Sequence, residues 1–183
     1  MARINPVDHE STQGPVRETL DRLKAKHGGL PNLIRTLGNS AVALQSYVGL
    51  GQAIGGGTLS AALREQIAVT MAGVNGCEYC ASAHTMIGKK NGVDGDELAR
   101  NLVGDSADDT TKAVLSFARV VTTKRGFVSD EDLTAIRDAG FDDGQVLEIV
   151  ANVVHNTLTN YVNHVAQTTN DFPRVAVGEP VSA

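Results

Sequence analysis

Apolar residues recur at steps of three and four along most of this chain. Val16, Leu20 and Leu23 follow that spacing up to Gly28 and Gly29, where it stops. Side chains at these steps share one face of an α-helix. No strand-like alternation of apolar and polar residues extends beyond four positions. The pattern therefore predicts an all-α protein, built as a single-domain helical bundle.

Capping residues and glycines set the expected ends of the helices. Ser40 and Ser60 are of the N-cap type, and the glycine run 55–57 is a helix breaker. The stretch after Pro173 lacks helical spacing and is expected to be unpaired. The expected helices cover roughly 16–27, 33–37, 41–54, 61–75, 77–90, 96–103, 114–125, 130–140 and 143–169.

The composition narrows the class of protein. A length of 183 residues suits one domain, expected to span 1–183 with its core at about 31–173. A net charge of -5 without a Lys/Arg cluster argues against nucleic-acid binding, because phosphate recognition needs clustered cations. No apolar run approaches the ~20 residues that span a bilayer, and no signal-type segment opens the chain. We therefore expect a cytoplasmic protein with no membrane partner.

The two cysteines of the chain form a CxxC pair, Cys77 and Cys80, followed by His84 in the run NGCEYCASAH. On a helix these three positions share one face. A helix N-terminus and a nearby imidazole both lower the pKa of a thiol, and the thiolate is the reactive form. In a reducing compartment such a pair is more often catalytic or metal-binding than structural. Dithiol redox chemistry is the first hypothesis.

Glu65 lies on the expected helix before this motif. If the two helices pack antiparallel across the Asn75–Gly76 turn, its carboxylate can reach His84. A carboxylate held against a histidine fixes the tautomer and raises the basicity of the ring. In the alternative, Glu65 pairs on the surface near Arg64 or faces solvent.

The spacing Glu65-x11-Cys77-x2-Cys80-x3-His84 resembles the alkylhydroperoxidase D (AhpD-like) family, within the wider carboxymuconolactone decarboxylase superfamily. The similarity is close over about 59–90, and the helical layout is similar over 31–173. It implies an all-helical subunit that forms trimers or trimer-based hexamers. It also implies peroxide reduction without haem, flavin or metal. Tyr79 stands where some members carry a second histidine, and the decarboxylase branch typically lacks the cysteine pair.

The resemblance implies that Cys80 attacks the hydroperoxide and that Cys77 resolves the product. The residues alone divide the two roles less clearly. Cys77 is nearest the helix N-terminus, which favours a thiolate there, whereas Cys80 lies one turn from the base His84. We expect Cys80, Cys77, His84 and Glu65 to be catalytic, with Cys80 as nucleophile. The cycle passes through a sulfenic acid and a disulfide, which an external dithiol of lipoyl or thioredoxin type reduces.

A zinc site is a second interpretation of the motif. Cys77, Cys80 and His84, with His155 or His164 as a fourth ligand, are the right residue types. Zinc motifs normally present a second ligand pair at short spacing, however, and these two histidines are nine positions apart. We therefore expect no metal and no other cofactor. The remaining alternatives are a carboxymuconolactone decarboxylase-type enzyme and a non-enzymatic redox-switch subunit.

A polar stripe follows the last expected helix. It either lines a cleft or subunit interface, or satisfies itself and faces solvent, and no catalytic role is assigned to it. His9 and His27, by contrast, are expected at the surface. The stripe consists of Asn152, His155, Asn156, Asn160, Asn163 and His164.

Overall fold

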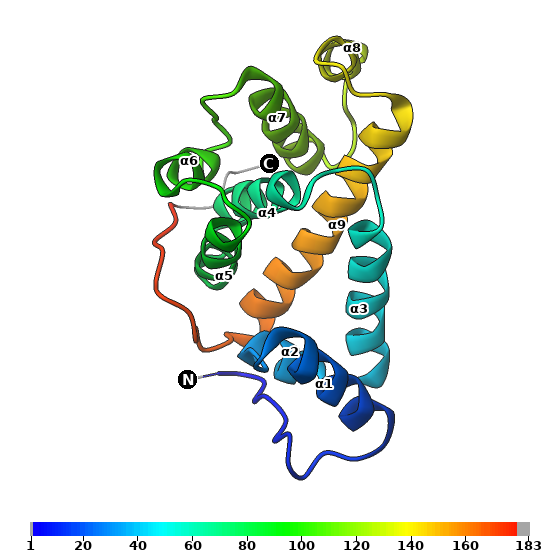
Figure 1. Ribbon diagram of the computed structural model, residues 1–183, viewed down its shortest axis with the longest axis vertical. Helices are drawn as coiled ribbons and strands as arrows, with labels where there is room; N and C mark the ends of the chain where they lie inside the picture. Colours follow the sequence, from blue (N-terminus) through cyan, green and yellow to red (C-terminus); the bar gives the residue numbers. More distant parts are fainter. Residues whose placement is uncertain (1, 179–183) are drawn as a thin grey trace.

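Nine α-helices make up the part of the chain that the computed structural model describes, residues 2–178 (Figure 1). No strand occurs in this range, so the all-α prediction is confirmed. None of these helices is both long and apolar enough to cross a membrane. The helices are α1 Gly14–His27, α2 Asn32–Leu37, α3 Ala41–Gly55, α4 Ala61–Asn75, α5 Glu78–Lys90, α6 Gly95–Asn101, α7 Asp109–Thr123, α8 Asp130–Asp138 and α9 Asp143–Ala166.

The expected capping residues begin and end these helices. Ser40 and Ser60 accept hydrogen bonds from the backbone N–H groups of Ala43 and Leu63 at the starts of α3 and α4. The last helix was expected to reach about residue 169 but ends at Ala166. Gln167 adopts the left-handed conformation with φ 48°, which stops the helix.

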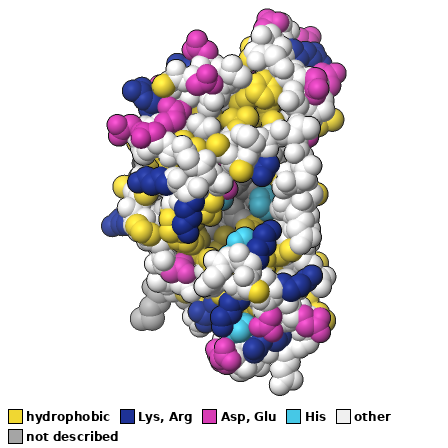
Figure 2. Space-filling view, in the orientation of Figure 1, with side chains coloured by type: hydrophobic (Ala, Val, Ile, Leu, Met, Phe, Trp, Pro, Cys, Tyr) yellow, Lys and Arg dark blue, Asp and Glu magenta, His cyan; other side chains and the backbone are white. Residues whose placement is uncertain are grey.

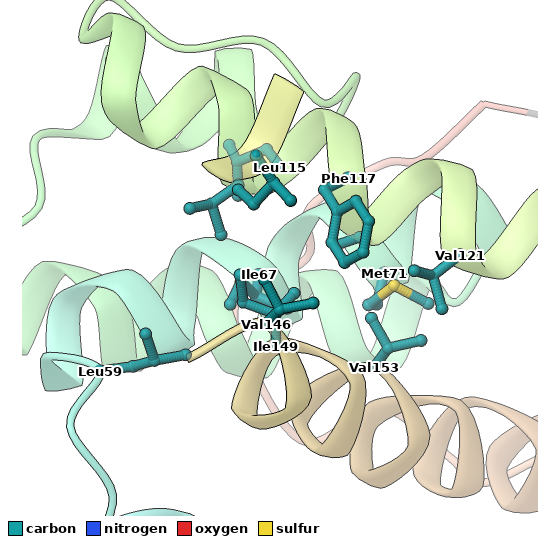
Figure 3. Packing of buried hydrophobic residues seen from close by; sticks show 12 residues of the cluster. Leu59, Ile67, Met71, Leu115, Phe117, Val121, Val146, Ile149 and Val153 are labelled. Carbon is teal, nitrogen blue, oxygen red and sulfur yellow. The ribbon is translucent and has the colours of Figure 1, made fainter. Parts of the chain in front are cut away.

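The long helix α9 runs diagonally through the molecule and contacts α3 on one side and α4 and α5 on the other (Figure 1). Helices α7 and α8 lie toward one end, and α1 and α2 toward the other. Two apolar clusters fill the interior. One joins α4, α7, α8 and α9 (Figure 3) and includes Ile67, Met71, Leu115 and Ile149.

The second apolar cluster surrounds the cysteine pair. It brings Leu20 of α1, Leu37 of α2 and Leu44 of α3 against the start of α5, where Cys77 and Cys80 are buried. A sulfur placed there loses its contact with water. The fold therefore puts the dithiol in a low-dielectric environment, where hydrogen bonds decide its charge.

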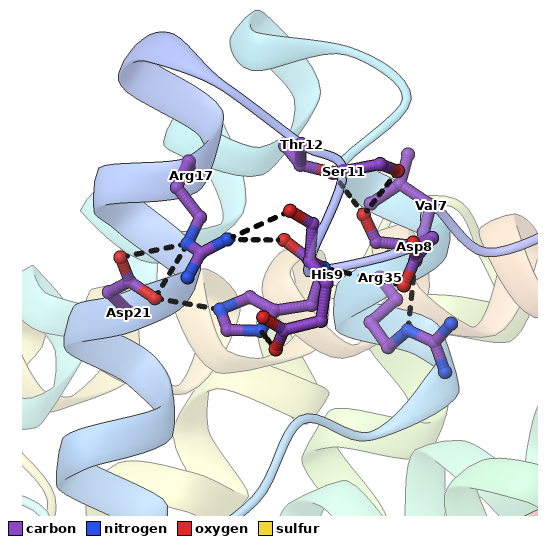
Figure 4. Close-up of polar contacts among 9 residues, drawn as sticks. Val7, Asp8, His9, Ser11, Thr12, Arg17, Asp21 and Arg35 are labelled. Carbon is purple, nitrogen blue, oxygen red and sulfur yellow. Dashed lines mark hydrogen bonds and ion pairs between the residues drawn. The ribbon is translucent and has the colours of Figure 1, made fainter.

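His9 is buried, with 8% of its surface exposed, so its expected place at the surface is wrong. Its ring lies between two carboxylates, with Nε2 2.7 Å from Asp21 and Nδ1 2.9 Å from Glu10 (Figure 4). Arg17 bridges to the same Asp21 at 3.0 Å. The segment before α1 folds back onto that helix, and the local sequence pattern does not reveal this long-range contact.

The chain after Pro173 was expected to be unpaired, but through residue 178 it contacts the rest of the molecule. Arg174 forms an ion pair with Glu78 at 2.8 Å, and the backbone N–H of Val175 donates to Ser82 at 3.0 Å. Val177 packs against the cluster around the cysteines. Both partners, Glu78 and Ser82, belong to α5, which is far from residues 174–177 in the sequence. The rest of the expected tail, 179–183, lies outside the described residues.

Candidate active site

A tight turn between α4 and α5 places the two cysteines. Gly76 adopts the left-handed conformation with φ 66°, which ends α4 and lets α5 begin almost at once. Cys77 is the N-cap of α5, and its Sγ accepts a hydrogen bond from the backbone N–H of Cys80 at 3.3 Å. Both cysteines are free thiols, exposed by only 1% and 2%, and their sulfurs are 2.6 Å apart.

The same packing of α4 on α5 joins Glu65 to His84. The carboxylate Oε2 lies 2.8 Å from Nδ1 of the ring, so Glu65 neither pairs at the surface nor faces solvent alone. Burial lowers the pKa of His84, but the charge and the hydrogen bond of Glu65, with a smaller contribution from Cys77, together outweigh burial and raise the pKa above its usual value. The arrangement makes the pair a candidate proton acceptor near the dithiol.

The pKa values of the two thiols are shifted in opposite directions. The hydrogen bond shared with Cys80 lowers the pKa of Cys77, and the backbone N–H of Cys80 acts in the same direction. Burial raises the pKa of Cys80. Negative charge on the resting pair therefore favours Cys77, the position nearest the helix N-terminus.

The expected direct contact between Cys80 and His84 is not formed. Among the described residues, no hydrogen bond joins His84 to either sulfur, because the Cys80 side chain turns toward Cys77 and Asn163 instead. The positive charge of His84 still contributes to lowering the pKa of Cys77. A proton that leaves the thiol pair for His84 needs a side-chain movement or a bridging water.

The sequence did not predict that Asn163 of α9 contacts the cysteine pair. Its side-chain amide donates to Cys80 Sγ at 3.2 Å and lies 3.9 Å from Cys77 Sγ. Asn160, one turn earlier, accepts a hydrogen bond from Asn75 at 2.7 Å. The signal was present as the polar stripe on an otherwise apolar helix, and part of that stripe lines the dithiol.

His155 of α9 lies on a different side of the site from Asn163, against α3. Its ring stacks on Tyr47 of α3 with centroids 4.8 Å apart and planes 11° from parallel. Burial, followed by the charge of Glu65, raises the pKa of Tyr47 to about 12. Figure 2 shows a hollow on this face, with histidine side chains within it. The described residues hold no cluster of three or more His, Cys, Asp and Glu side chains suited to a metal, so His155 and His164 complete no such site there.

Tyr79, between the two cysteines, has a packing role. Its hydroxyl accepts a hydrogen bond from the backbone N–H of Leu33 at 3.1 Å, and its ring meets Phe172 edge-on at 5.5 Å. These contacts tie α5 to α2 and to the C-terminal segment.

A pocket of about 350 Å³ lies against one of the two cysteines. Its walls include Cys77, Tyr79, Asn163 and His164, and Cys80 is absent from them. The pocket lies where the end of α9 passes the start of α5. Cys77 is thus the cysteine that borders this pocket.

Known proteins share the sequence pattern around this site. Residues 41–123 match the model of the carboxymuconolactone decarboxylase family, a range that contains Glu65, both cysteines and His84. The search of curated proteins gives no significant match.

Several solved structures share the fold. An uncharacterized peroxidase-related protein from Ralstonia eutropha JMP134, described as an alkylhydroperoxidase AhpD core, has a TM-score of 0.82 at 24% identity, over 93% of this chain and 92% of that chain. An uncharacterized peroxidase-related protein from Silicibacter sp. TM1040 has 0.79 at 20%, over 92% and 93%. A cysteine-to-alanine variant of the debrominase Bmp8, in complex with 2,3,4-tribromopyrrole, has 0.78 at 18%, over 92% and 91%.

These matches confirm the resemblance drawn from the cysteine motif and extend it to the whole helical layout. The family match covers α3 to α7, and the structural matches cover 92–93% of the chain. Residues 41–123 of this chain match the carboxymuconolactone decarboxylase family, and the chain as a whole has the AhpD-like fold.

Proposed function

We propose that this protein is a thiol-dependent peroxidase that reduces hydroperoxides through a Cys77–Cys80 dithiol/disulfide cycle. One observation carries the proposal: two free thiols with sulfurs 2.6 Å apart lie beside a carboxylate–imidazole pair joined at 2.8 Å. The arrangement combines a nucleophile, a base and a group that orients the base. The peroxidase-related proteins of the same fold are consistent with it.

In the first step, His84 takes one proton from the thiol pair, directly or through a water molecule. Glu65 stabilises the imidazolium that results, because its charge raises the pKa of the ring. The remaining proton is shared between Cys77 and Cys80 over the 2.6 Å separation of their sulfurs. When this proton is bound to Cys77, Cys80 is a thiolate and can attack the hydroperoxide.

In the second step, the Cys80 thiolate attacks the distal oxygen of the hydroperoxide. An S–O bond forms and the O–O bond breaks, so sulfur loses two electrons and the peroxide gains them. The leaving alkoxide or hydroxide takes the proton from His84 and departs as alcohol or water. Cys80 is left as a sulfenic acid.

In the third step, Cys77 gives its proton to His84 and the resulting thiolate attacks the sulfenic sulfur. The hydroxide that leaves takes this proton and departs as water, and a Cys77–Cys80 disulfide forms. An external dithiol restores both thiols by exchange and leaves as its own disulfide. The pocket beside Cys77 supports an approach of this donor to that sulfur. A donor of lipoyl or thioredoxin type is proposed.

We further propose that the subunit assembles into a trimer or a trimer-based hexamer. Large apolar side chains remain exposed along α9, a surface suited to a partner copy. These are Leu147, Val154, Tyr161 and Val165. Sedimentation equilibrium of the purified protein tests the assembly, and a monomer at micromolar concentration contradicts it.

The function is tested by the steady-state consumption of hydrogen peroxide and an alkyl hydroperoxide with excess dithiol. Many equivalents consumed per subunit support the enzyme, whereas a single equivalent indicates a redox-switch subunit. Activity on a carboxymuconolactone that survives Cys77→Ser/Cys80→Ser supports a decarboxylase instead. Because the debrominase Bmp8 shares the fold, 2,3,4-tribromopyrrole is included as a substrate, and faster turnover of it than of peroxide contradicts the proposal.

A further inference from the structure

Four asparagines on one face of α9 divide into two pairs. Asn152 donates its amide N–H to the backbone carbonyl of Glu148 at 2.8 Å, and Asn156 donates to that of Asn152 at 2.9 Å. These two amides are satisfied within their own helix. The amides of Asn160 and Asn163 have no such bond to α9 and extend toward the cysteine pair.

Asn163 touches a reacting atom directly. Its Nδ2 donates to Cys80 Sγ at 3.2 Å, and the side chain is only 5% exposed. An amide held at this depth keeps its orientation relative to the sulfur. A hydrogen bond to sulfur is stronger when the sulfur is charged, so this contact favours the thiolate over the thiol.

Asn160 carries a donor without a partner. The side chain is 0% exposed, and Asn75 donates to its Oδ1 at 2.7 Å. Its Nδ2 is buried and makes no hydrogen bond. Buried amide groups are normally paired, so an idle one beside a reactive sulfur points to a role that arises during the reaction. Both Asn160 and Asn163 act to lower the pKa of Cys80, against the larger effect of burial.

Cys80 needs such donors more than Cys77 does. Both cysteines are almost fully buried, but Cys77 caps α5 and receives the backbone N–H of Cys80 at 3.3 Å, whereas Cys80 lies inside the helix and its sulfur receives no backbone N–H from residues 2–178. Without water, a thiolate at Cys80 is stable only if fixed dipoles replace the lost solvation.

We propose that the side-chain amides of Asn160 and Asn163 form a two-donor site that stabilises the Cys80 thiolate. Asn163, which contacts the sulfur, is then a catalytic residue, and Asn160 is the second donor of the site. The inference rests on the proposed peroxidase function, in which Cys80 is the nucleophile. As the proton passes to His84, Asn163 strengthens its existing bond and Asn160 gains its first partner. Asn75 positions Asn160 for that bond.

The test measures the acidity of Cys80 by itself, in a Cys77→Ser background that removes the neighbouring thiol. Thiolate absorbance at 240 nm is followed against pH for this protein and for versions that add Asn163→Leu or Asn160→Leu. Leucine matches asparagine in size but has no donor. Each added substitution is expected to raise the pKa of Cys80 by about one unit, a tenfold loss of thiolate at fixed pH. Asn156→Leu is the matched control, because that amide is satisfied within α9.

Equal pKa values for Asn163→Leu and the Asn156→Leu control overturn the proposal. Where Asn163→Leu does not fold, judged by circular dichroism, Asn163→Asp answers the same question. It places an acceptor where the donor was and is expected to raise the pKa further. Peroxide turnover is measured in parallel on proteins that retain Cys77. The expected pKa shifts without any peroxide turnover support the two-donor site and reject the peroxidase, whereas turnover without the shifts does the reverse.

Discussion

Glu65 and His84 meet across the interface of α4 and α5, with Oε2 of the carboxylate 2.8 Å from Nδ1 of the ring. The contact occupies one ring nitrogen and leaves Nε2 to exchange protons. Because both groups are largely buried, the interaction is weakly screened by salt. Most of what raises the pKa of His84 therefore comes from one neighbour, which a single substitution removes.

Glu65→Gln is expected to lower the pKa of His84, because the charge that raises it is lost while a hydrogen-bonding group remains. The rising limb of kcat/KM against pH then moves to lower pH, and the plateau falls by at least about tenfold. Peroxide consumption from pH 5 to 9 measures both. Glu131→Gln, an exposed change on α8, is the control. An unchanged pH profile for Glu65→Gln contradicts the proposed proton acceptor.

Substitution of each cysteine separates the two thiol roles. Cys80→Ser is expected to abolish peroxide consumption, because the attacking sulfur is lost. Cys77→Ser is expected to reduce peroxide once per subunit and then stop as a Cys80 sulfenic acid, since no neighbouring thiol remains to form the disulfide. Dimedone labelling followed by mass spectrometry detects this species. A label on Cys77 in the Cys80→Ser protein, with none on Cys80 in the other, reverses the assignment.

Stability should also depend on pH through His84. A pKa raised in the folded state means that the folded protein binds the proton more tightly than the unfolded chain does. This contribution is complete below the unfolded value near 6.5 and is lost as pH rises through the folded value. In the Cys77→Ser/Cys80→Ser background, which removes thiol titration, the melting temperature should fall from pH 6 to 8.5. The fall should be smaller once Glu65→Gln is added, and an equal fall in both proteins contradicts the link.

Two helical glycines offer a matched test of packing. A Cβ atom at Gly73 of α4 would overlap the backbone carbonyl of Leu102, whereas one at Gly49 of α3 would meet nothing within 4 Å. Gly73→Ala is therefore expected to destabilise the fold by about 3 kcal/mol, because the backbone of the neighbouring segment must shift. Gly49→Ala should stabilise it by roughly 0.5–1 kcal/mol through helix propensity. Urea denaturation compares the two, and similar effects would be inconsistent with this helix contact.

Local features of the fold follow directly from the order of residues along the chain. The spacing of Val16, Leu20 and Leu23 predicted a helix that forms as α1, and Ser40 and Ser60 cap α3 and α4 as expected. Helical period and capping depend on neighbours within a few residues, so they are written in short stretches of sequence. For the same reason, the shared turn of Cys77 and Cys80 followed from their spacing.

The environment of the sulfurs, in contrast, does not follow from short stretches of sequence. Asn163 reaches Cys80 from a helix far along the chain, and His9 is buried because a distant turn of α1 supplies Asp21. Which thiol is the more acidic depends on burial and on such contacts, and burial is a property of the packed molecule. Helix spacing and capping predicted where the chemistry lies on the chain. Tertiary packing decided the acidity of the two sulfurs, because distant elements must come together before water is excluded and individual hydrogen bonds become decisive.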